Sequence, residues 1–268
     1  MTTVRRPAVA GSFYPDDPDE LAGMIDAMLA GAAQSDTEQA DNAPAIAIIV
    51  PHAGYVYSGP IAATAYARVR AWRASITRVV VIGPAHRSPV HGLALSSADA
   101  FSTPLGSVPI DHIANGLLAR RPGVYTDDEA HTLEHSVEVQ LPFLQRVLGH
   151  DWSLVPIVAG AASAVMVADA LDTVWAADGT LVVVSTDLSH YHDQRTARIM
   201  DAATAAAIIS EQWETLDGEH ACGVVPVRGA LELVRRHREK VTLLDLRNSG
   251  DTAGPSSRVV GYGSFSVR

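Results

Sequence analysis

The feature that most constrains this chain is a repeated alternation of short apolar runs with longer segments of helical periodicity. Four runs are continuous and rich in Val and Ile, which is typical of strands covered on both faces of a sheet. A fifth run, near the C-terminus, could pair antiparallel. Strand followed by helix, repeated, predicts a three-layer α/β fold around a mostly parallel sheet. The predicted strands are residues 45–50, 78–82, 154–158, 181–184 and 257–266.

The segments between these runs predict seven helices and no second domain. The chain has 268 residues, which is enough to bury a sizeable core. No stretch resembles an interdomain linker, so we expect a single domain over residues 1–268. The predicted loops are residues 34–42, 159–161 and 247–255. The predicted helices are residues 18–30, 59–70, 111–119, 136–148, 162–176, 194–214 and 227–238.

The charge and the cysteine count exclude several classes of function. The formal net charge is −10, and an acidic surface disfavours nucleic acids and anionic membranes as partners. A single cysteine, Cys222, cannot form an internal disulfide, which favours a reducing compartment. The first residues are too polar, and too broken by Pro7, Gly11 and Pro15, for a signal peptide. No apolar run approaches the roughly 20 residues of a membrane helix. We therefore expect a cytoplasmic protein.

Histidines follow three of the predicted strands. His52 comes after the first strand, His86 after the second and His190 after the fourth. Ligands of open α/β sheets bind at the carboxyl ends of the strands, so these side chains should meet at one edge. Neutral imidazole is a good ligand for zinc, iron and copper. Each histidine alone could equally cap a backbone carbonyl, but their shared placement favours a metal site.

Cys222 and the pair Asp187 and His190 are further candidates. Cys222 lies just before a predicted helix, where a thiol can act as a thiolate ligand or nucleophile, although free cysteines are often small buried hydrophobes. Asp187 precedes His190 by three residues, so a carboxylate could orient this imidazole as a general acid or base. Asp187 could instead cap a helical turn.

The segment 127–138 is dense in residues that can bind metals. It lacks the His-Glu-x-x-His arrangement of zinc proteases. We interpret Glu134 and His135 as facing the substrate or a metal ligand. The remaining residues, His131 among them, are predicted to form a capped, solvated helix start.

With these residues assembled, the chain resembles the Memo family nearly from end to end. Each motif alone is weak, but the ordered set is specific. The matching segments are Ala10-Gly11-Ser12-Phe13-Tyr14-Pro15, Pro51-His52-Ala53-Gly54-Tyr55, Gly83-Pro84-Ala85-His86, Thr103-Pro104-Leu105-Gly106, Glu134-His135-Ser136-Val137-Glu138, Ser185-Thr186-Asp187-Leu188-Ser189-His190 and Cys222-Gly223.

The resemblance implies a fold similar to that of class III extradiol dioxygenases. By motif matching it places the metal ligands at His52, His86 and Cys222, and further pocket residues at His135, Asp187 and His190. It implies iron or copper as cofactor, and as partners a radical S-adenosylmethionine protein and an AMMECR-type protein. The chain departs from the family pattern at Arg87, where a second histidine is often found, and at residues 224–227.

Three functions stay open at this point. The first is an oxidoreductase that uses Fe(II) or copper, in which cysteine in place of a carboxylate disfavours simple ring cleavage. The second is a binding or accessory module that holds a small molecule or peptide, with Tyr14, Tyr55 and Tyr57 as an amphipathic wall. The third is a zinc hydrolase with His190 as base. Cys222 makes this last function less natural, because hydrolytic zinc sites favour His and carboxylate ligands.

Overall fold

The computed structural model describes residues 2–35 and 44–268. The centre of its main sheet is parallel and runs in the order β2 (Ala47–Val50), β9 (Thr180–Ser185), β3 (Arg78–Pro84) and β8 (Ser153–Ala159). These strands correspond to the four Val/Ile-rich runs. The last strand, β12 (Val259–Val267), pairs antiparallel with β2. The predicted parallel centre is thus confirmed.

Four strands that the sequence did not predict extend the sheet. Three of them have only three residues, and the eight-residue fourth is interrupted by Asp245 and Arg247, so none carries a continuous apolar signal. Antiparallel pairs join β11 to β12, β10 to β12 and β4 to β8, and β7 pairs parallel with β4. The added strands are β4 (Leu93–Leu95), β7 (Val124–Thr126), β10 (His190–His192) and β11 (Val241–Asn248).

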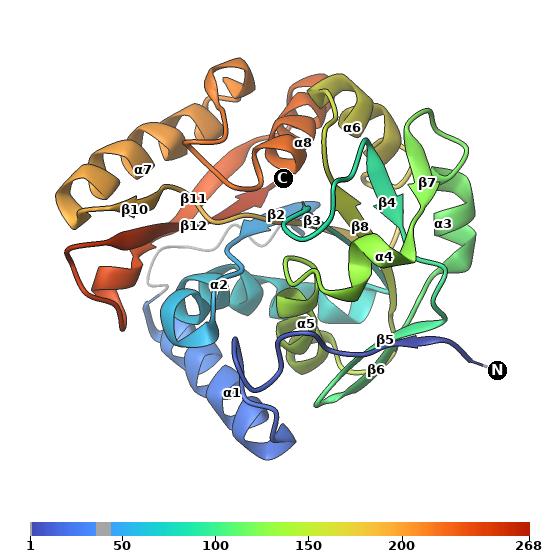
Figure 1. Cartoon of the computed structure of the whole chain (residues 1–268), viewed down its shortest axis with the longest axis horizontal. Helices are drawn as coiled ribbons and strands as arrows, with labels where there is room; N and C mark the ends of the chain where they lie inside the picture. Colours follow the sequence, from blue (N-terminus) through green and yellow to red (C-terminus); the bar gives the residue numbers. More distant parts are fainter. Residues whose placement is uncertain (1, 36–43) are drawn as a thin grey trace.

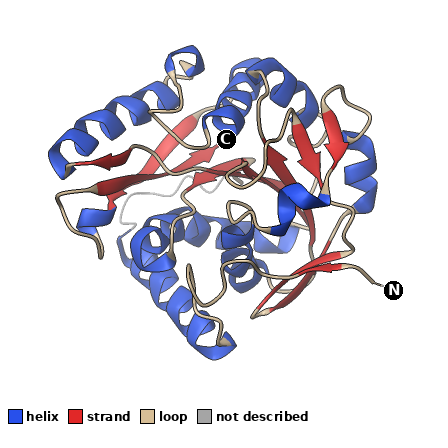
Figure 2. Cartoon of the chain, in the orientation of Figure 1, coloured by secondary structure: helices blue, strands red, loops and turns tan. Residues whose placement is uncertain are grey.

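Helices cover both faces of this sheet, as the three-layer prediction requires. Along β3, Val79 and Val81 pack into one apolar cluster, while Val80 and Ile82 pack into the other. This alternation follows from the two-residue period of a strand. Figures 1 and 2 show the layers. One face carries α1 (Pro18–Ser35), α2 (Tyr55–Val69) and α5 (Leu141–Leu148); the other carries α3 (His112–Leu118), α6 (Ala164–Leu171), α7 (Gln194–Ile209) and α8 (Val224–His237).

Several predicted boundaries differ from the structure. The predicted helix 136–148 is a 3-10 turn, Glu138–Gln140, followed by α5. The predicted helix 194–214 ends at Ile209, and Glu211 beyond it has a positive φ of 58°. The predicted loop 247–255 begins as the end of β11. Of the predicted loop 34–42, the first two residues belong to α1 and the rest lies outside the described residues.

The smaller elements lie beside the main sheet. No helix within residues 2–35 and 44–268 is long and apolar enough to cross a membrane. A separate three-stranded sheet joins β1, β5 and β6. These elements are β1 (Val4–Arg5), β5 (Ala100–Thr103), β6 (Gly106–Pro109), α4 (Asp128–Thr132) and the 3-10 turns Arg70–Ser75, Trp213–Thr215 and Ser249–Asp251.

A buried carboxylate, Glu138, ties the N-terminal segment to the body of the protein. Its oxygens accept hydrogen bonds from the Tyr14 hydroxyl at 2.5 Å and from the backbone N–H groups of Ala8 at 2.7 Å and Val9 at 3.0 Å. The guanidinium of Arg5 completes the set as an ion pair. The buried charge is therefore both paired and hydrogen-bonded, as a stable buried ion pair requires.

His131 is not part of a solvated helix start, and that prediction is wrong. Its side chain is buried, packs against Phe101 and hydrogen-bonds the Ala94 carbonyl at 3.1 Å through Nε2. Burial lowers the pKa of this imidazole to about 4. The Asp127 carboxylate does cap a helix, but this helix is α4, which the sequence did not predict, and not the predicted helix 136–148.

Replacing Glu138 should destabilise the whole domain. Glu138→Gln leaves the buried Arg5 without its counter-charge, so we expect a loss of about 3 kcal/mol in the free energy of unfolding. Urea denaturation of the wild type and the variant measures this difference. Glu129→Gln removes an exposed carboxylate from the same stretch of chain and should change the stability by less than about 0.5 kcal/mol. Equal effects of the two substitutions would contradict this account.

The buried His131 should make stability depend on pH. Its pKa is lower in the folded chain, so unfolding takes up a proton between about pH 6.5 and pH 4. Stability should fall as the pH decreases through this window, and His131 should contribute up to about 3 kcal/mol of the loss. We expect His131→Gln to reduce the slope of the free energy of unfolding against pH by an amount that corresponds to about one proton taken up on unfolding. Urea denaturation at a series of pH values measures this slope. An unchanged slope would show that His131 does not titrate this way.

Candidate metal centre

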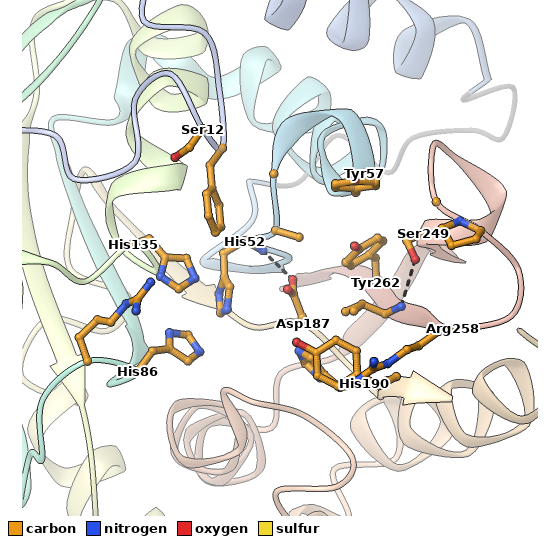
Figure 3. Close-up of a pocket in the computed structure, with 18 residues that line it drawn as sticks. Ser12, His52, Tyr57, His86, His135, Asp187, His190, Ser249, Arg258 and Tyr262 are labelled. Atoms are coloured by element: carbon orange, nitrogen blue, oxygen red, sulfur yellow. Dashed lines mark hydrogen bonds between the residues drawn. The ribbon is translucent and has the colours of Figure 1, made fainter. Parts of the chain in front are cut away.

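The candidate residues meet at the carboxyl edge of the parallel strands (Figure 3). His52 follows β2, His86 follows β3 and Asp187 follows β9, while His190 opens the short strand β10. Cys222 lies two residues before α8. One ligand atom from each of His52, His86 and Cys222 lies within 4.8 Å of the other two. These three side chains come from distant parts of the sequence.

This donor set fits a metal ion. Imidazole nitrogen binds such ions at about 2.0–2.1 Å and thiolate sulfur at about 2.3 Å, which separates tetrahedral ligands by about 3.4 Å. The Nε2 of His52 already lies 3.3 Å from the Cys222 sulfur. Small side-chain movements would therefore bring all three atoms into coordination. No metal is needed to explain the fold of the loops themselves, since each ligand is held by protein contacts.

The tautomer of His52 follows from the hydrogen bonds of Ser185. The Ser185 hydroxyl donates its one hydrogen to the Ser136 carbonyl at 2.6 Å and accepts from the Gln140 amide at 2.8 Å. It lies 2.9 Å from Nδ1 of His52, so this nitrogen must donate the proton. The lone pair of His52 is then on Nε2, which faces Cys222. Burial lowers the pKa of His52 well below its ordinary value, which keeps the ring neutral.

His86 is oriented by the buried carboxylate of Glu134. One oxygen of Glu134 lies 2.9 Å from Nδ1 of His86, and the other accepts from the His86 backbone N–H at 2.6 Å. Hydrogen bonds from His86 outweigh the burial of Glu134 and lower the pKa of this carboxyl to about 2. A carboxylate only accepts, so Nδ1 of His86 is the donor and Nε2 is free to bind a metal.

Cys222 is held between the end of β9 and the start of α8. Its sulfur accepts from the Asp187 backbone N–H at 3.3 Å. The next residue, Gly223, allows this close approach, because a Cβ there would lie 2.7 Å from the Ser185 carbonyl oxygen. Burial raises the pKa of the thiol to about 12. Without a bound cation Cys222 is therefore a neutral thiol, which argues against its being a free nucleophile. As a metal ligand it would release its proton when the cation binds.

His135 lies against both histidine ligands. Its ring stacks on His86 with centroids 4.7 Å apart and meets His52 edge-on at 5.5 Å. Its buried Nδ1 has no hydrogen-bond partner among the described residues, and burial lowers the pKa of the ring to about 4. His135 therefore enters the pocket as a neutral ring at neutral pH.

Asp187 and His190 lie on the other side of His52. The buried carboxylate of Asp187 accepts the His52 backbone N–H at 2.8 Å, so it fixes the ligand loop. Burial raises the pKa of Asp187. Its interaction with His190 is through space, since no hydrogen bond joins the two side chains in the described chain. Asp187 thus positions His52 directly and can influence His190 only by its charge.

A cavity of about 620 Å³ opens over these residues. Tyr57 lines it, but Tyr14 and Tyr55 do not, so that part of the predicted tyrosine wall is wrong. Both are buried, with their hydroxyls bonded to Glu138 and to the Val139 carbonyl. Their burial depends on contacts that no local pattern encodes. Ser12 and Phe13, which also line the cavity, lie in a family motif but were not assigned to the pocket. Pocket residues that the sequence did not single out are Tyr191, Ser249, Gly254, Pro255, Arg258, Val260 and Tyr262.

Comparison with known proteins identifies the family. The model of the Memo-like protein family matches residues 5–266. The chain belongs to this family. A MEMO1 family protein of Aquifex aeolicus is 36% identical over 97% of both chains. One of Methanopyrus kandleri is 36% identical over 98% of this chain and 99% of its own, and one of Thermoplasma acidophilum is 32% identical over 97% of each. The predicted membership of the Memo family is confirmed.

Removing the acceptor that orients His52 should weaken metal binding without removing a ligand of this Memo-family site. Ser185→Ala frees Nδ1 of His52, so the tautomer with its lone pair on Nε2 is no longer enforced. We expect a 10–100-fold loss of metal affinity, measured by competition with a chelator. Ser210→Ala, on the surface after α7, serves as control. Equal affinities of wild type and Ser185→Ala would contradict the assigned role of Ser185.

Proposed function

We propose that this protein is a metal-dependent oxidoreductase that binds iron or copper through His52, His86 and Cys222. The observation that carries the proposal is the convergence of two oriented imidazoles and one thiol within 4.8 Å, with both imidazoles lining an open cavity. Thiolate and imidazole together suit redox-active ions such as copper and iron. When bound, such an ion would supply electron transfer to or from a substrate.

The residues around the ligands support this chemistry. Glu134 and Ser185 each accept the Nδ1–H of one histidine ligand, which directs coordination to Nε2. His135 is held neutral by its burial, so it can offer one hydrogen bond to a bound molecule but little charge. His190 lines the cavity and is partly exposed, which makes it the side chain best placed to move a proton to or from a substrate.

Two other functions use the same cavity. An accessory role with radical S-adenosylmethionine and AMMECR-type partners is supported only by the aromatic lining, which suits binding without turnover. A zinc hydrolase would use the same three ligands with His190 as base. The thiol disfavours it, because cysteine adds charge donation that hydrolysis does not need. Metal identity and oxygen dependence separate these cases.

Metal content should depend on all three ligands. We expect near-stoichiometric iron or copper by mass spectrometry in protein purified anaerobically. His52→Ala, His86→Ala and Cys222→Ser should each lose most of it, because only two of the three protein ligands remain to hold the ion. His237→Ala is the matched control, since this surface histidine pairs with Asp172 far from the strand ends.

Each outcome has a clear meaning for the proposal. Iron or copper that is lost in the three variants and kept in the control supports the oxidoreductase. Stoichiometric zinc, with activity that survives strict anaerobiosis, favours the hydrolase. A wild type that stays metal-free after reconstitution, with its circular dichroism spectrum intact, would overturn the metal site and favour the accessory role.

A further inference from the structure

Two guanidinium groups that form no ion pair with any described residue line the cavity of an otherwise acidic chain. Arg87 and Arg258 both line it, and neither forms an ion pair or side-chain hydrogen bond within the part of the chain that the structure describes. The chain as a whole carries a net charge of −10. Asp187 is the one carboxylate among the described lining residues, and the His52 backbone N–H already engages it. The accessible charge in the cavity is therefore positive.

Arg258 is held in place by an aromatic ring. Its guanidinium carbon lies 4.4 Å from the centroid of the Tyr191 ring, which is a cation–π contact. Tyr191 is itself 62% exposed. This pair buries little apolar area, so packing does not explain its placement. The contact leaves the edge of the guanidinium, with its N–H donors, free for a bound group.

The backbone is strained at this position. Tyr191 has a φ of 65°, which a bulky side chain rarely adopts. It is the extra residue of a bulge, since His190 pairs with Val260 and His192 pairs with Val259. Bulges beside active sites redirect side chains, and strain of this kind persists where it has a use. Here the bulge turns the Tyr191 ring toward the Arg258 guanidinium.

We propose that the cavity takes a small organic carboxylate with a flat apolar body, and that Arg258, supported by Tyr191, binds its acid group. Figure 3 shows Arg258 and His86 on opposite sides of the cavity, with His52 and Asp187 between them. An acid group on Arg258 therefore leaves the opposite end of the molecule directed toward the two histidine ligands. Phe13, Tyr57 and Tyr262 line the cavity and offer apolar surface to the body of the substrate.

The inference rests on the proposed function only for the role of the substrate end that points away from Arg258. Its test does not require a metal. The probes are phenylacetate and phenylacetamide, which differ in charge and hardly in shape. Their affinities are compared by ligand-observed NMR titration in protein freed of metal by a chelator. Wild type should bind phenylacetate at least tenfold more tightly, because a charge-assisted bidentate contact is much stronger than a neutral one.

Substitutions then locate the contact. Arg258→Gln should bring the two affinities within about twofold, and Arg258→Lys should keep only part of the preference, since an ammonium cannot bind bidentately. Tyr191→Phe should keep it, because the ring face and not the hydroxyl holds Arg258. Arg195→Gln is the matched control: it removes an exposed guanidinium of α7 that does not line the cavity and should leave the preference unchanged.

Defined results would overturn the inference. Equal affinities of wild type for both probes would exclude a carboxylate-binding cavity. If the preference for phenylacetate survives in Arg258→Gln and disappears in Arg87→Gln, Arg87 and not Arg258 binds the acid group. If the preference follows Arg258 while the wild type binds no metal, the carboxylate site stands and the oxidoreductase fails. If the wild type binds metal but shows no preference for phenylacetate, the carboxylate site fails and the metal site stands.

Discussion

The parallel register between β2 and β9 is the constraint on which the candidate site depends. It pairs Val50 with Ser185 at the last step of both strands, and the Thr186 N–H then donates to the Val50 carbonyl. His52 follows Val50 by two residues, so its Nδ1 reaches the Ser185 hydroxyl. A shift of the register by one residue would turn Ser185 to the other face of the sheet and leave His52 without its acceptor.

Buried hydrogen bonds then determine what each histidine can do. Ser185 is saturated by Ser136, Gln140 and His52, and Glu134 accepts four N–H groups, two from His86 and one each from His135 and Ser136. An unsatisfied polar group is costly in this interior, so these contacts hold the rings in one tautomer. The chain thus presents a neutral His52 with its lone pair toward a thiol, and a His86 whose Nδ1 is held by a carboxylate, whether or not an ion is bound. Such preorganisation is what a metal site needs.

The outer part of the cavity follows a different principle. His52 is buried and each histidine ligand is held by several hydrogen bonds, whereas Arg258 and Tyr191 are exposed and held by one contact and a strained backbone. The histidine ligands and the residues proposed to select the substrate, Arg258 and Tyr191, therefore belong to different parts of the cavity wall.

The sequence by itself determined the parallel centre of the fold and the side chains that end its strands. Continuous Val/Ile runs report burial on both faces, and His52 and His86 follow two of these runs directly, so local patterns suffice for them. The family was also readable, because its motifs recur in order along the whole chain. Only the tertiary structure decided that Cys222 faces His52 across 170 residues, that His131 and Tyr14 are buried, and that Tyr191 and Arg258 form the rim. These features arise from contacts between distant segments, and the free energy of such contacts depends on how the layers pack and not on the residues that flank each side chain.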